Sequence, residues 1–125
     1  MIVDTNALSA FADGSSLAIA ALQTANEVSV PVIVLGEFRY GITHSRRHRE
    51  YEAWLERYLP AFRVLEVTAE TALEYALLRS ELRHLGKPIP SNDVWIAALC
   101  RQHDLPLLSR DAHFDNVKRL RRQTW

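Results

Sequence analysis

Four acidic residues stand at the ends of apolar segments, where a negative charge is costly unless something compensates for it. They are Asp4 after Ile2-Val3, Glu37 within VIVLGEF, Asp93 ahead of VWIAAL, and Asp111 after LPLLSR. A buried, unpaired carboxylate costs a large part of what a small domain has in net stability. If the fold brings the four together, a shared divalent cation removes that cost. The set therefore predicts a metal site and a metal-dependent enzyme.

The donor atoms of this set indicate which metal and which reaction. Carboxylate oxygens without histidine or thiolate favour Mg²⁺, with Mn²⁺ as a second possibility, over zinc. His44 and His48 share a predicted helical face, but they lie in an arginine-rich stretch and fit no zinc spacing well. Acid-bound Mg²⁺ usually meets phosphates, so hydrolysis of a phosphodiester by a metal-activated water is the natural chemistry. No GxxxxGK[ST] or GxGxxG motif points to nucleotide triphosphates or dinucleotides.

Each acid also has an ordinary structural explanation when it is taken alone. Asp93 falls on the same helical side as Ile96 and Cys100, yet an acid in the first turn also caps a helix or favours its dipole. Glu37 extends an apolar stripe and could form an ion pair with Arg39, Arg63 or another base. The remaining candidates have alternatives as turn, cap or strand-end residues, and these are Asp4, Asp111, Asn6 and Ser109.

The composition indicates one domain without a strongly charged surface. The 125 residues are 48% apolar, which suffices for a single core, so we predict one domain over 1–125. Fifteen basic and fifteen acidic side chains cancel, so any binding of nucleic acid must be local. Arginines cluster at 44–49 and 118–122, and either cluster could equally be a solvated surface.

The sequence gives no sign of membrane insertion or of a disulfide. No apolar run approaches the roughly 20 residues that cross a bilayer, and the start MIVDTN has no basic region or cleavable apolar segment. We therefore expect a cytoplasmic protein without a membrane partner. Cys100 is the lone cysteine, and its apolar neighbours indicate a core thiol.

Periodicity and turn residues predict alternating strands and helices. A strand over 1–4 precedes a helix at ALSAFA, for which Thr5-Asn6 can supply the cap. The apolar positions Ala69, Ala72, Leu73, Ala76 and Leu77 indicate a long helix that ends at Gly86. The other predicted strands cover 27–31, 62–67 and 105–109, with a possible edge strand among the last residues. The other predicted helices cover 15–26, 32–43, 46–59 and 91–104.

This alternation predicts a three-layer α/β/α domain around a central, mostly parallel sheet of four to five strands. In such folds ligands collect beyond the carboxyl ends of the strands. Asp4 and Asp111 both stand at or just past such ends. The predicted fold therefore favours a common site.

Read in order, IVDTN, VIVLGEFRYGI, PSNDVWIAA and LPLLSRDAHF resemble the PIN-domain family, and specifically its VapC-type ribonuclease toxins. The resemblance spans nearly the whole chain. It implies that Asp4, Glu37, Asp93 and Asp111 form the active site. Asp4 and Asp93 would bind the metal most directly, with Glu37 and Asp111 completing the site and orienting water or a second ion. Asn6 and Ser109 would be supporting polar groups.

The resemblance also implies an endoribonuclease that cuts RNA, pairs with a small antitoxin that blocks the site, and usually forms a homodimer. The stretch 32–59 combines aromatics with arginines and could seat an antitoxin segment or RNA, and an antitoxin arginine that reaches the acids would inhibit by replacing the charge of the metal. One departure is the tail KRLRRQTW, which lacks the apolar last strand of many relatives.

Two rival interpretations belong to other classes. A phosphoacceptor signalling domain also sets acids around Mg²⁺ at strand ends, but FRVLEVT carries no aspartate at its end and Asp4 has no acidic neighbour. The other is an inactive interaction module that keeps the fold, against which the four intact acids argue. The sequence does not name the RNA, because single-strand recognition rests on surface details.

Overall fold

In the computed structural model, which describes residues 1–125, five short parallel strands form the centre of the molecule. Their order in the sheet is β3-β2-β1-β4-β5. The predicted α/β architecture with a mostly parallel sheet of four to five strands is confirmed. The strands are β1 (Ile2–Val3), β2 (Ser29–Pro31), β3 (Arg63–Leu65), β4 (Leu107–Leu108) and β5 (Arg122–Gln123).

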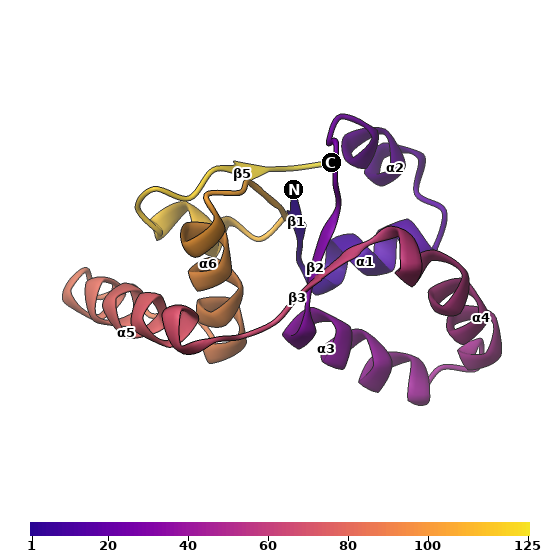
Figure 1. Cartoon of the computed structure of the whole chain (residues 1–125), viewed down its shortest axis with the longest axis horizontal. Coiled ribbons are helices and arrows are strands. Elements are labelled where there is room, and N and C mark those ends of the chain that lie inside the picture. Colours follow the sequence, from indigo (N-terminus) through magenta and orange to yellow (C-terminus); the bar gives the residue numbers. More distant parts are fainter.

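Helices cover the sheet on two sides and complete the three layers. Figure 1 shows α5 and α6 together on one side of the strands and α1, α3 and α4 on the other. The predicted helix over 32–43 is observed as α3 with the same bounds. The six α-helices are α1 (Thr5–Ala12), α2 (Ser16–Gln23), α3 (Val32–Thr43), α4 (His48–Tyr58), α5 (Ala69–His84) and α6 (Ser91–His103).

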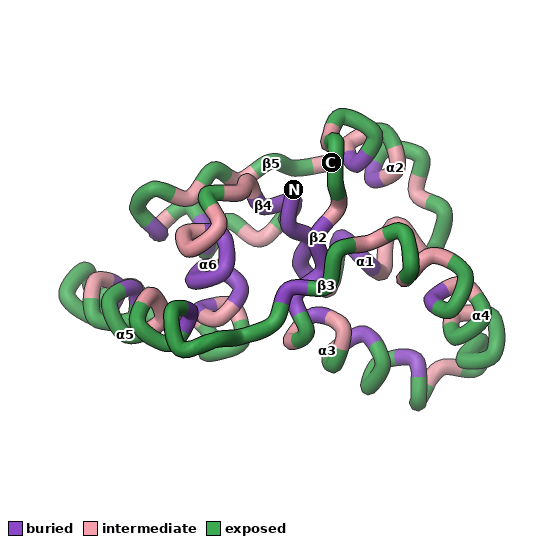
Figure 2. Tube along the Cα trace, in the orientation of Figure 1, coloured by how far each residue is buried: buried purple, intermediate pink, exposed green.

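The inner strands and α6 form the core. Ile2, Val3 and Leu107 have no exposed surface, as expected for strands of a parallel sheet that is covered on both faces. Figure 2 shows the same buried region continuing from β1, β2 and β4 into α6. Cys100 lies within it with 2% of its surface exposed. Burial raises the pKa of its thiol to about 12, which confirms the predicted core thiol.

The strand order creates a crevice at one edge of the sheet. The chain adds β2 and β3 on one side of β1 and then returns to place β4 and β5 on the other side. In open parallel sheets, ligands bind beyond the carboxyl ends of the strands where the order reverses in this way. The residues that follow β1 and β4 lie here, as does the first turn of α6, because α6 runs back toward the start of β4.

Helix α1 begins two residues earlier than the sequence predicts. We expected Thr5-Asn6 to cap a helix at ALSAFA, whereas α1 starts at Thr5 and Asp4 is its N-cap. The backbone amide of Ala7 donates to Asp4 Oδ1 at 2.8 Å. An aspartate suits this position because it satisfies an amide that has no partner within the helix. The predicted cap was therefore wrong by one or two residues, and Asp4 takes its place.

The apolar positions that predict α5 are not its buried face. Leu73 and Leu77 are 64% and 49% exposed, while Leu78 and Leu82 point into the core. Thr71 is also buried, and its hydroxyl donates to Gln102 on α6, which compensates for the burial. The pattern gave the helix correctly, but the buried face is set by how α5 packs on α6.

The C-terminal tail forms an edge strand through polar contacts. The Ser109 amide donates to the Gln123 carbonyl at 2.9 Å, and the Leu107 amide donates to that of Arg121 at 2.9 Å. The Arg122 guanidinium donates to both carboxylate oxygens of Asp115 at 2.8 Å. The predicted edge strand is confirmed, and backbone pairing with an arginine clamp replaces the apolar side chains of a typical last strand.

A buried arginine joins α5 to α6. The Arg101 side chain is 2% exposed, and its Nη1 and Nη2 donate to the two oxygens of Glu81 at 2.7 and 3.2 Å. Its Nε lies 3.2 Å from Glu74 Oε2. Glu81 thus holds the guanidinium in a planar, two-bonded geometry, and Glu74 adds a neighbouring charge without a hydrogen bond.

We expect Arg101→Ala to lower the free energy of unfolding by about 2 to 3 kcal/mol, because it removes charged hydrogen bonds and buried side-chain packing. This loss of stability is smaller than that expected on breaking a fully buried ion pair, because the Glu81 side chain is 40% exposed. Urea denaturation measures the change. Arg83→Ala, at an exposed position of α5, is the matched control, and equal stability of the two variants would show that the clamp does not hold the helices.

Candidate acidic site at the carboxyl edge of the sheet

Asp4 is the buried member of the four acids. It follows β1 directly, is 6% exposed, and has its Oδ1 occupied by the Ala7 amide. Burial raises the pKa of its carboxyl, and the charges of Asp111 and Glu37 add to the rise. The Ser109 hydroxyl beside it and the Ala7 amide oppose that rise in pKa. The capping bond fixes the orientation of the carboxylate and leaves Oδ2 free of the helix.

Asp93 is half-buried in the first turn of α6. Partial burial, followed by the charges of Asp111, Glu37 and Asp4, raises the pKa of its carboxyl to about 6. An acid that only capped the helix would be stabilised in its charged form and would have a lowered pKa. The opposite direction shows that partial burial and the charges of the other acids together outweigh the helix dipole.

Glu37 is half-buried on α3 and takes part in a single hydrogen bond. The Thr5 hydroxyl donates to its Oε1 at 3.0 Å, which joins α1 to α3. No ion pair involves Glu37, and Arg63 instead pairs with Glu27 at 3.5 Å. The alternative explanation of Glu37 as an ion-pair partner is therefore not observed.

Asp111 and Ser109 lie on the segment that leaves β4. The Asp111 amide donates to Ser109 Oγ at 2.9 Å, and Asp111 Oδ1 accepts from the His113 amide at 2.9 Å. Asp111 thereby caps the 3₁₀ helix η2 (Ala112–Asn116). The His113 ring nitrogen Nδ1 also lies 2.9 Å from Asp111 Oδ1. Ser109 is fully buried. Its hydroxyl lowers the pKa of Asp4, and its oxygen accepts the backbone amide of Asp111.

The fold brings the four predicted acids into one electrostatic group. The charge of each of the other three raises the pKa of Asp93. Asn6, in contrast, is exposed on α1, and no hydrogen bond links its side chain to the acids. The four acids and Ser109 thus lie together, whereas the structure gives Asn6 no contact with them.

The donor set fits a hard divalent cation that is only partly coordinated by protein. No three histidine, cysteine, aspartate or glutamate side chains are arranged closely enough to hold a metal by themselves. Mg²⁺ commonly keeps several waters and takes one or two carboxylates, with phosphate oxygens filling other positions. Carboxyl groups whose pKa is raised by burial and by neighbouring negative charges are the groups that a cation would stabilise, and here these are Asp4 and Asp93.

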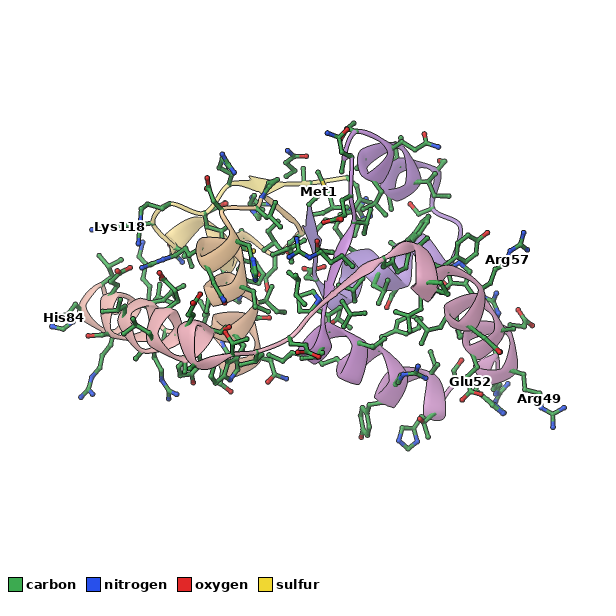
Figure 3. All side chains as sticks on the ribbon, in the orientation of Figure 1. Met1, Arg49, Glu52, Arg57, His84 and Lys118 are labelled. Atoms are coloured by element: carbon green, nitrogen blue, oxygen red, sulfur yellow. The ribbon has the colours of Figure 1, made fainter.

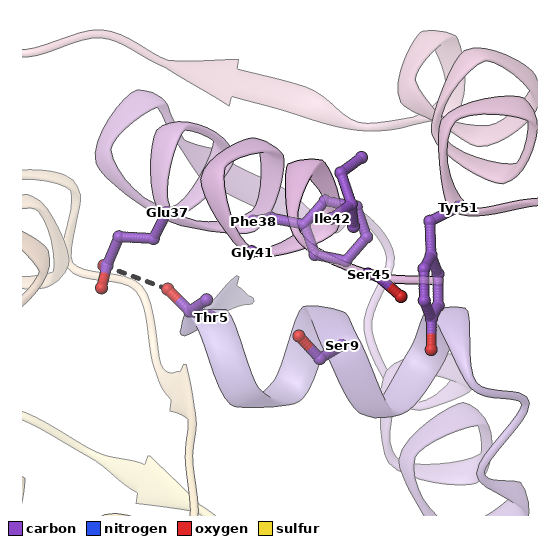
Figure 4. Close-up of a pocket in the computed structure, with 8 residues that line it drawn as sticks. All are labelled: Thr5, Ser9, Glu37, Phe38, Gly41, Ile42, Ser45 and Tyr51. Carbon is purple, nitrogen blue, oxygen red and sulfur yellow. Dashed lines mark hydrogen bonds between the residues drawn. The ribbon is translucent and has the colours of Figure 1, made fainter. Parts of the chain in front are cut away.

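A pocket of about 280 Å³ opens beside this group. It lies between α1, α3 and the start of α4, and Figure 4 shows the Thr5–Glu37 hydrogen bond at one end and Tyr51 at the other. Phe38 and Ile42 contribute its apolar side. Glu37 thus belongs both to the acidic group and to the pocket.

Sequence reasoning missed two residues that position the acids. Thr5 was considered only as a helix cap, yet it holds Glu37. His113 was not singled out, yet it contacts Asp111. Their adjacency to Asp4 and Asp111 was the available signal, but the partner of Thr5 is 32 residues away and only the fold reveals it.

One further expectation is settled by position. His44 and His48 do not share a helix, because His44 ends α3 and His48 begins α4, so the predicted shared face was wrong. Both are exposed. None of the helices combines the length and apolarity needed to cross a membrane.

Comparison with known proteins places this architecture in a family. The model of the PIN domain matches residues 1–120. The chain therefore belongs to the PIN-domain family. Its five-stranded parallel sheet, with acids beyond the carboxyl ends of the strands where the strand order reverses, is the fold of a PIN domain. Within this family it belongs with the VapC ribonucleases. Ribonuclease VapC2 of Haemophilus influenzae is 31% identical over 82% of this chain and 79% of that protein, and Ribonuclease VapC5 of Mycobacterium tuberculosis is 30% identical over 90% and 84%.

Solved structures have the same fold over almost the whole chain. FitAcB from Neisseria gonorrhoeae has a TM-score of 0.81 at 27% identity, with 97% of this chain and 94% of that chain covered. VapBC2 from Rickettsia felis, solved bound to a promoter DNA fragment, has a TM-score of 0.88 at 22% identity, with 99% and 97% covered. The second likeness concerns the fold alone.

The raised pKa of Asp93 gives a pH dependence of stability with a definite sign. Its folded pKa of about 6 lies above the ordinary value of 3.8, so the folded state binds more protons than the unfolded state between these values. The free energy of unfolding contributed by this group therefore falls as pH rises through that window. Asp93→Asn should remove this fall, and in EDTA at pH 7.5 it should raise stability by about 1 to 2 kcal/mol after allowance for partial exposure.

Thermal unfolding across pH 4 to 7.5 in EDTA checks this expectation. Addition of Mg²⁺ at pH 7.5 should raise the melting temperature of the wild type more than that of Asp93→Asn, because a cation that binds the folded state stabilises it by mass action. The same pH slope in both proteins would show that Asp93 is not crowded by the other acids.

Proposed function

We propose that this protein is a metal-dependent endoribonuclease that acts as the toxin of a toxin–antitoxin pair. The observation that carries the proposal is the gathering of Asp4, Glu37, Asp93 and Asp111, whose charges add to the effect of partial burial in raising the pKa of Asp93 to about 6. Four acids kept together at the carboxyl edge of the sheet oppose stability and require a functional reason. The likeness to proteins named Ribonuclease VapC supports RNA as the substrate.

Asp4 and Asp93 are the proposed metal ligands, and Mg²⁺ or Mn²⁺ is the proposed ion. When bound, such an ion supplies an activated water and stabilises negative charge on phosphate oxygens. Asp4 suits a ligand role because the Ala7 amide fixes its orientation through Oδ1 at 2.8 Å. Asp93 suits it because ionisation of its carboxyl becomes favourable once a cation offsets the three neighbouring charges.

Glu37 and Asp111 complete the proposed site by orienting water or a second ion. The Thr5 hydroxyl, 3.0 Å from Glu37 Oε1, restricts the glutamate side chain and leaves Oε2 available to accept a proton from water. The amide of His113 does the same for Asp111 by occupying Oδ1. Ser109 is a positioning residue, since it contacts both Asp4 and Asp111.

The proposed partner is a small antitoxin that covers the site, and the proposed assembly is a homodimer alone or a hetero-oligomer with that antitoxin. VapBC2 and FitAcB, which are similar in fold, support a paired system. An arginine of the antitoxin is the chemistry expected to reach the four acids, because it replaces the charge of the cation. The proposed location is the cytoplasm, because an RNA-cleaving enzyme acts where its RNA substrate lies.

The test is RNA cleavage by single variants in Mg²⁺ or Mn²⁺. Asp4→Asn and Asp93→Asn should each reduce kcat by roughly 100-fold or more, because each removes a charge that holds the cation against the phosphate. Total cellular RNA, with cleavage sites mapped after brief exposure, provides substrates without a prior choice of RNA. EDTA should abolish cleavage by the wild type, and either ion should restore it.

The matched control is Asp104→Asn, the same chemical change at the exposed C-cap of α6. Asn tolerates the left-handed backbone of Asp104, whose φ is 51°, so the fold is preserved. This control should cleave like the wild type. Equal cleavage by all four proteins would refute the assignment and favour an interaction module without nuclease activity.

A further inference from the structure

The pocket beside the acids has a polar end and an aromatic end. Thr5 and Glu37 form one end, and Ser45 and Tyr51 lie toward the other (Figure 4). The Tyr51 ring is held in place, because its hydroxyl donates to Asp13 and its edge meets Phe38 with ring centroids 6.2 Å apart. A fixed aromatic wall with hydrogen-bonding groups around it is a surface that can receive a flat, polar ring.

Gly41 of α3 lines the pocket. A side-chain carbon at Gly41 would meet no atom within 4 Å, so no neighbouring group fills this space. The volume of about 280 Å³ lies just below the roughly 300 to 1,000 Å³ of ordinary small-molecule sites. The space therefore suits one small ring system, whereas a larger ligand would extend out of it.

Three arginines stand near the aromatic end, together with Asp13 and Glu50. The Arg47 guanidinium carbon lies 5.1 Å from the centroid of the Tyr51 ring and also pairs with Glu50 at 3.0 Å. Arg46 and Arg49 are exposed and form no ion pair with an acid of the chain. Figure 3 shows Arg49 projecting outward from the start of α4. These cations offset, at this end, the repulsion that the four acids exert on phosphates.

We propose that this pocket binds one unpaired nucleobase of the RNA, next to the phosphodiester that is cut. The proposal depends on the position of Glu37, which belongs both to the acidic group and to the wall of the pocket. A base held in the pocket therefore lies beside the reaction centre. The inference rests on the proposed ribonuclease function and adds to it a determinant of sequence preference. In this arrangement the sugar–phosphate backbone of the bound RNA passes toward Arg46 and Arg49.

A nucleobase matches the pocket in each of its chemical features. Its face can lie against Tyr51, its edge can reach the hydroxyls of Thr5 and Ser45, and its attached phosphates need the arginines. An extended peptide would need partners for its backbone amides and carbonyls, and no strand edge borders the pocket, which is lined by α1, α3, α4 and the loop before α4. The lining thus favours a base over an extended peptide, and the antitoxin measurement below distinguishes a base from a helical peptide.

The test fills the pocket without disturbing the acids. Gly41→Leu places an apolar side chain in the open space, and leucine favours a helix more than glycine does. The control is Gly36→Leu on the same helix, where a side chain also meets nothing within 4 Å but does not line the pocket. Gly41→Leu should lower kcat/KM on single-stranded RNA by roughly 5- to 150-fold, the range of one stacked base, and the control should cleave like the wild type.

A substrate series separates loss of base binding from general damage. A random-sequence single-stranded RNA pool, cut by the wild type in Mg²⁺, should show a base preference at one position near the cleavage site. Removal of that base, leaving an abasic ribose, should slow the wild type by the same factor as Gly41→Leu slows cleavage of intact RNA. The two changes combined should cost no more than either alone, since both remove one interaction.

Three outcomes overturn the inference, and they are distinguishable. Gly41→Leu with unchanged kcat/KM and unchanged base preference would leave the nuclease assignment standing without this pocket. Unchanged cleavage combined with escape from antitoxin inhibition would assign the pocket to the protein partner. Wild-type cleavage no faster than that of Asp93→Asn would remove both the proposed function and the base pocket.

Discussion

The mutual repulsion of four carboxylates at one edge of a parallel sheet is the constraint around which the site is organised. Asp4 is buried, and partial burial together with the charges of Asp111, Glu37 and Asp4 raises the pKa of Asp93 to about 6. A protein selected for stability alone would not place these groups together, since each neutral replacement relieves the repulsion. The arrangement persists because the strand order brings the ends of β1 and β4 side by side, and because the reaction proposed for the site needs the charge that stability opposes.

The same local devices that build the fold also aim the acids. Asp4 and Asp111 each cap the helix that follows them, through the amides of Ala7 and His113. Capping and a site role are therefore compatible, because one carboxylate oxygen serves the backbone and the other remains free. Glu37 lacks such a cap and is held by Thr5 instead, which ties α3 to α1 and fixes one wall of the neighbouring pocket. Glu37 therefore joins the pocket to the group of acids.

Much of this could be predicted from the sequence, and the failures share a cause. The parallel sheet, the bounds of α3, the edge strand and the identity of the four acids were all predicted, because apolar periodicity, breaker residues and motif order are local properties of the chain. The start of α1 and the shared face of His44 and His48 were wrong, since a turn or cap shifted by one or two residues changes which side a residue faces. The apolar stripe of α5 predicted a helix but not that Leu73 and Leu77 would be exposed, which depends on how α5 packs against α6.

The sequence by itself determined the chemical character of this protein: four acids in a fixed order, apolar strands to position them, and no competing nucleophile or nucleotide motif. Only the tertiary structure decided which side chains hold the acids, that Asn6 stands apart from them, and that an open pocket lies beside Glu37. The reason is physical. Residue type and local spacing fix what a group can do, whereas a contact such as that of Thr5 with Glu37, 32 residues apart, exists only once helices pack on a sheet.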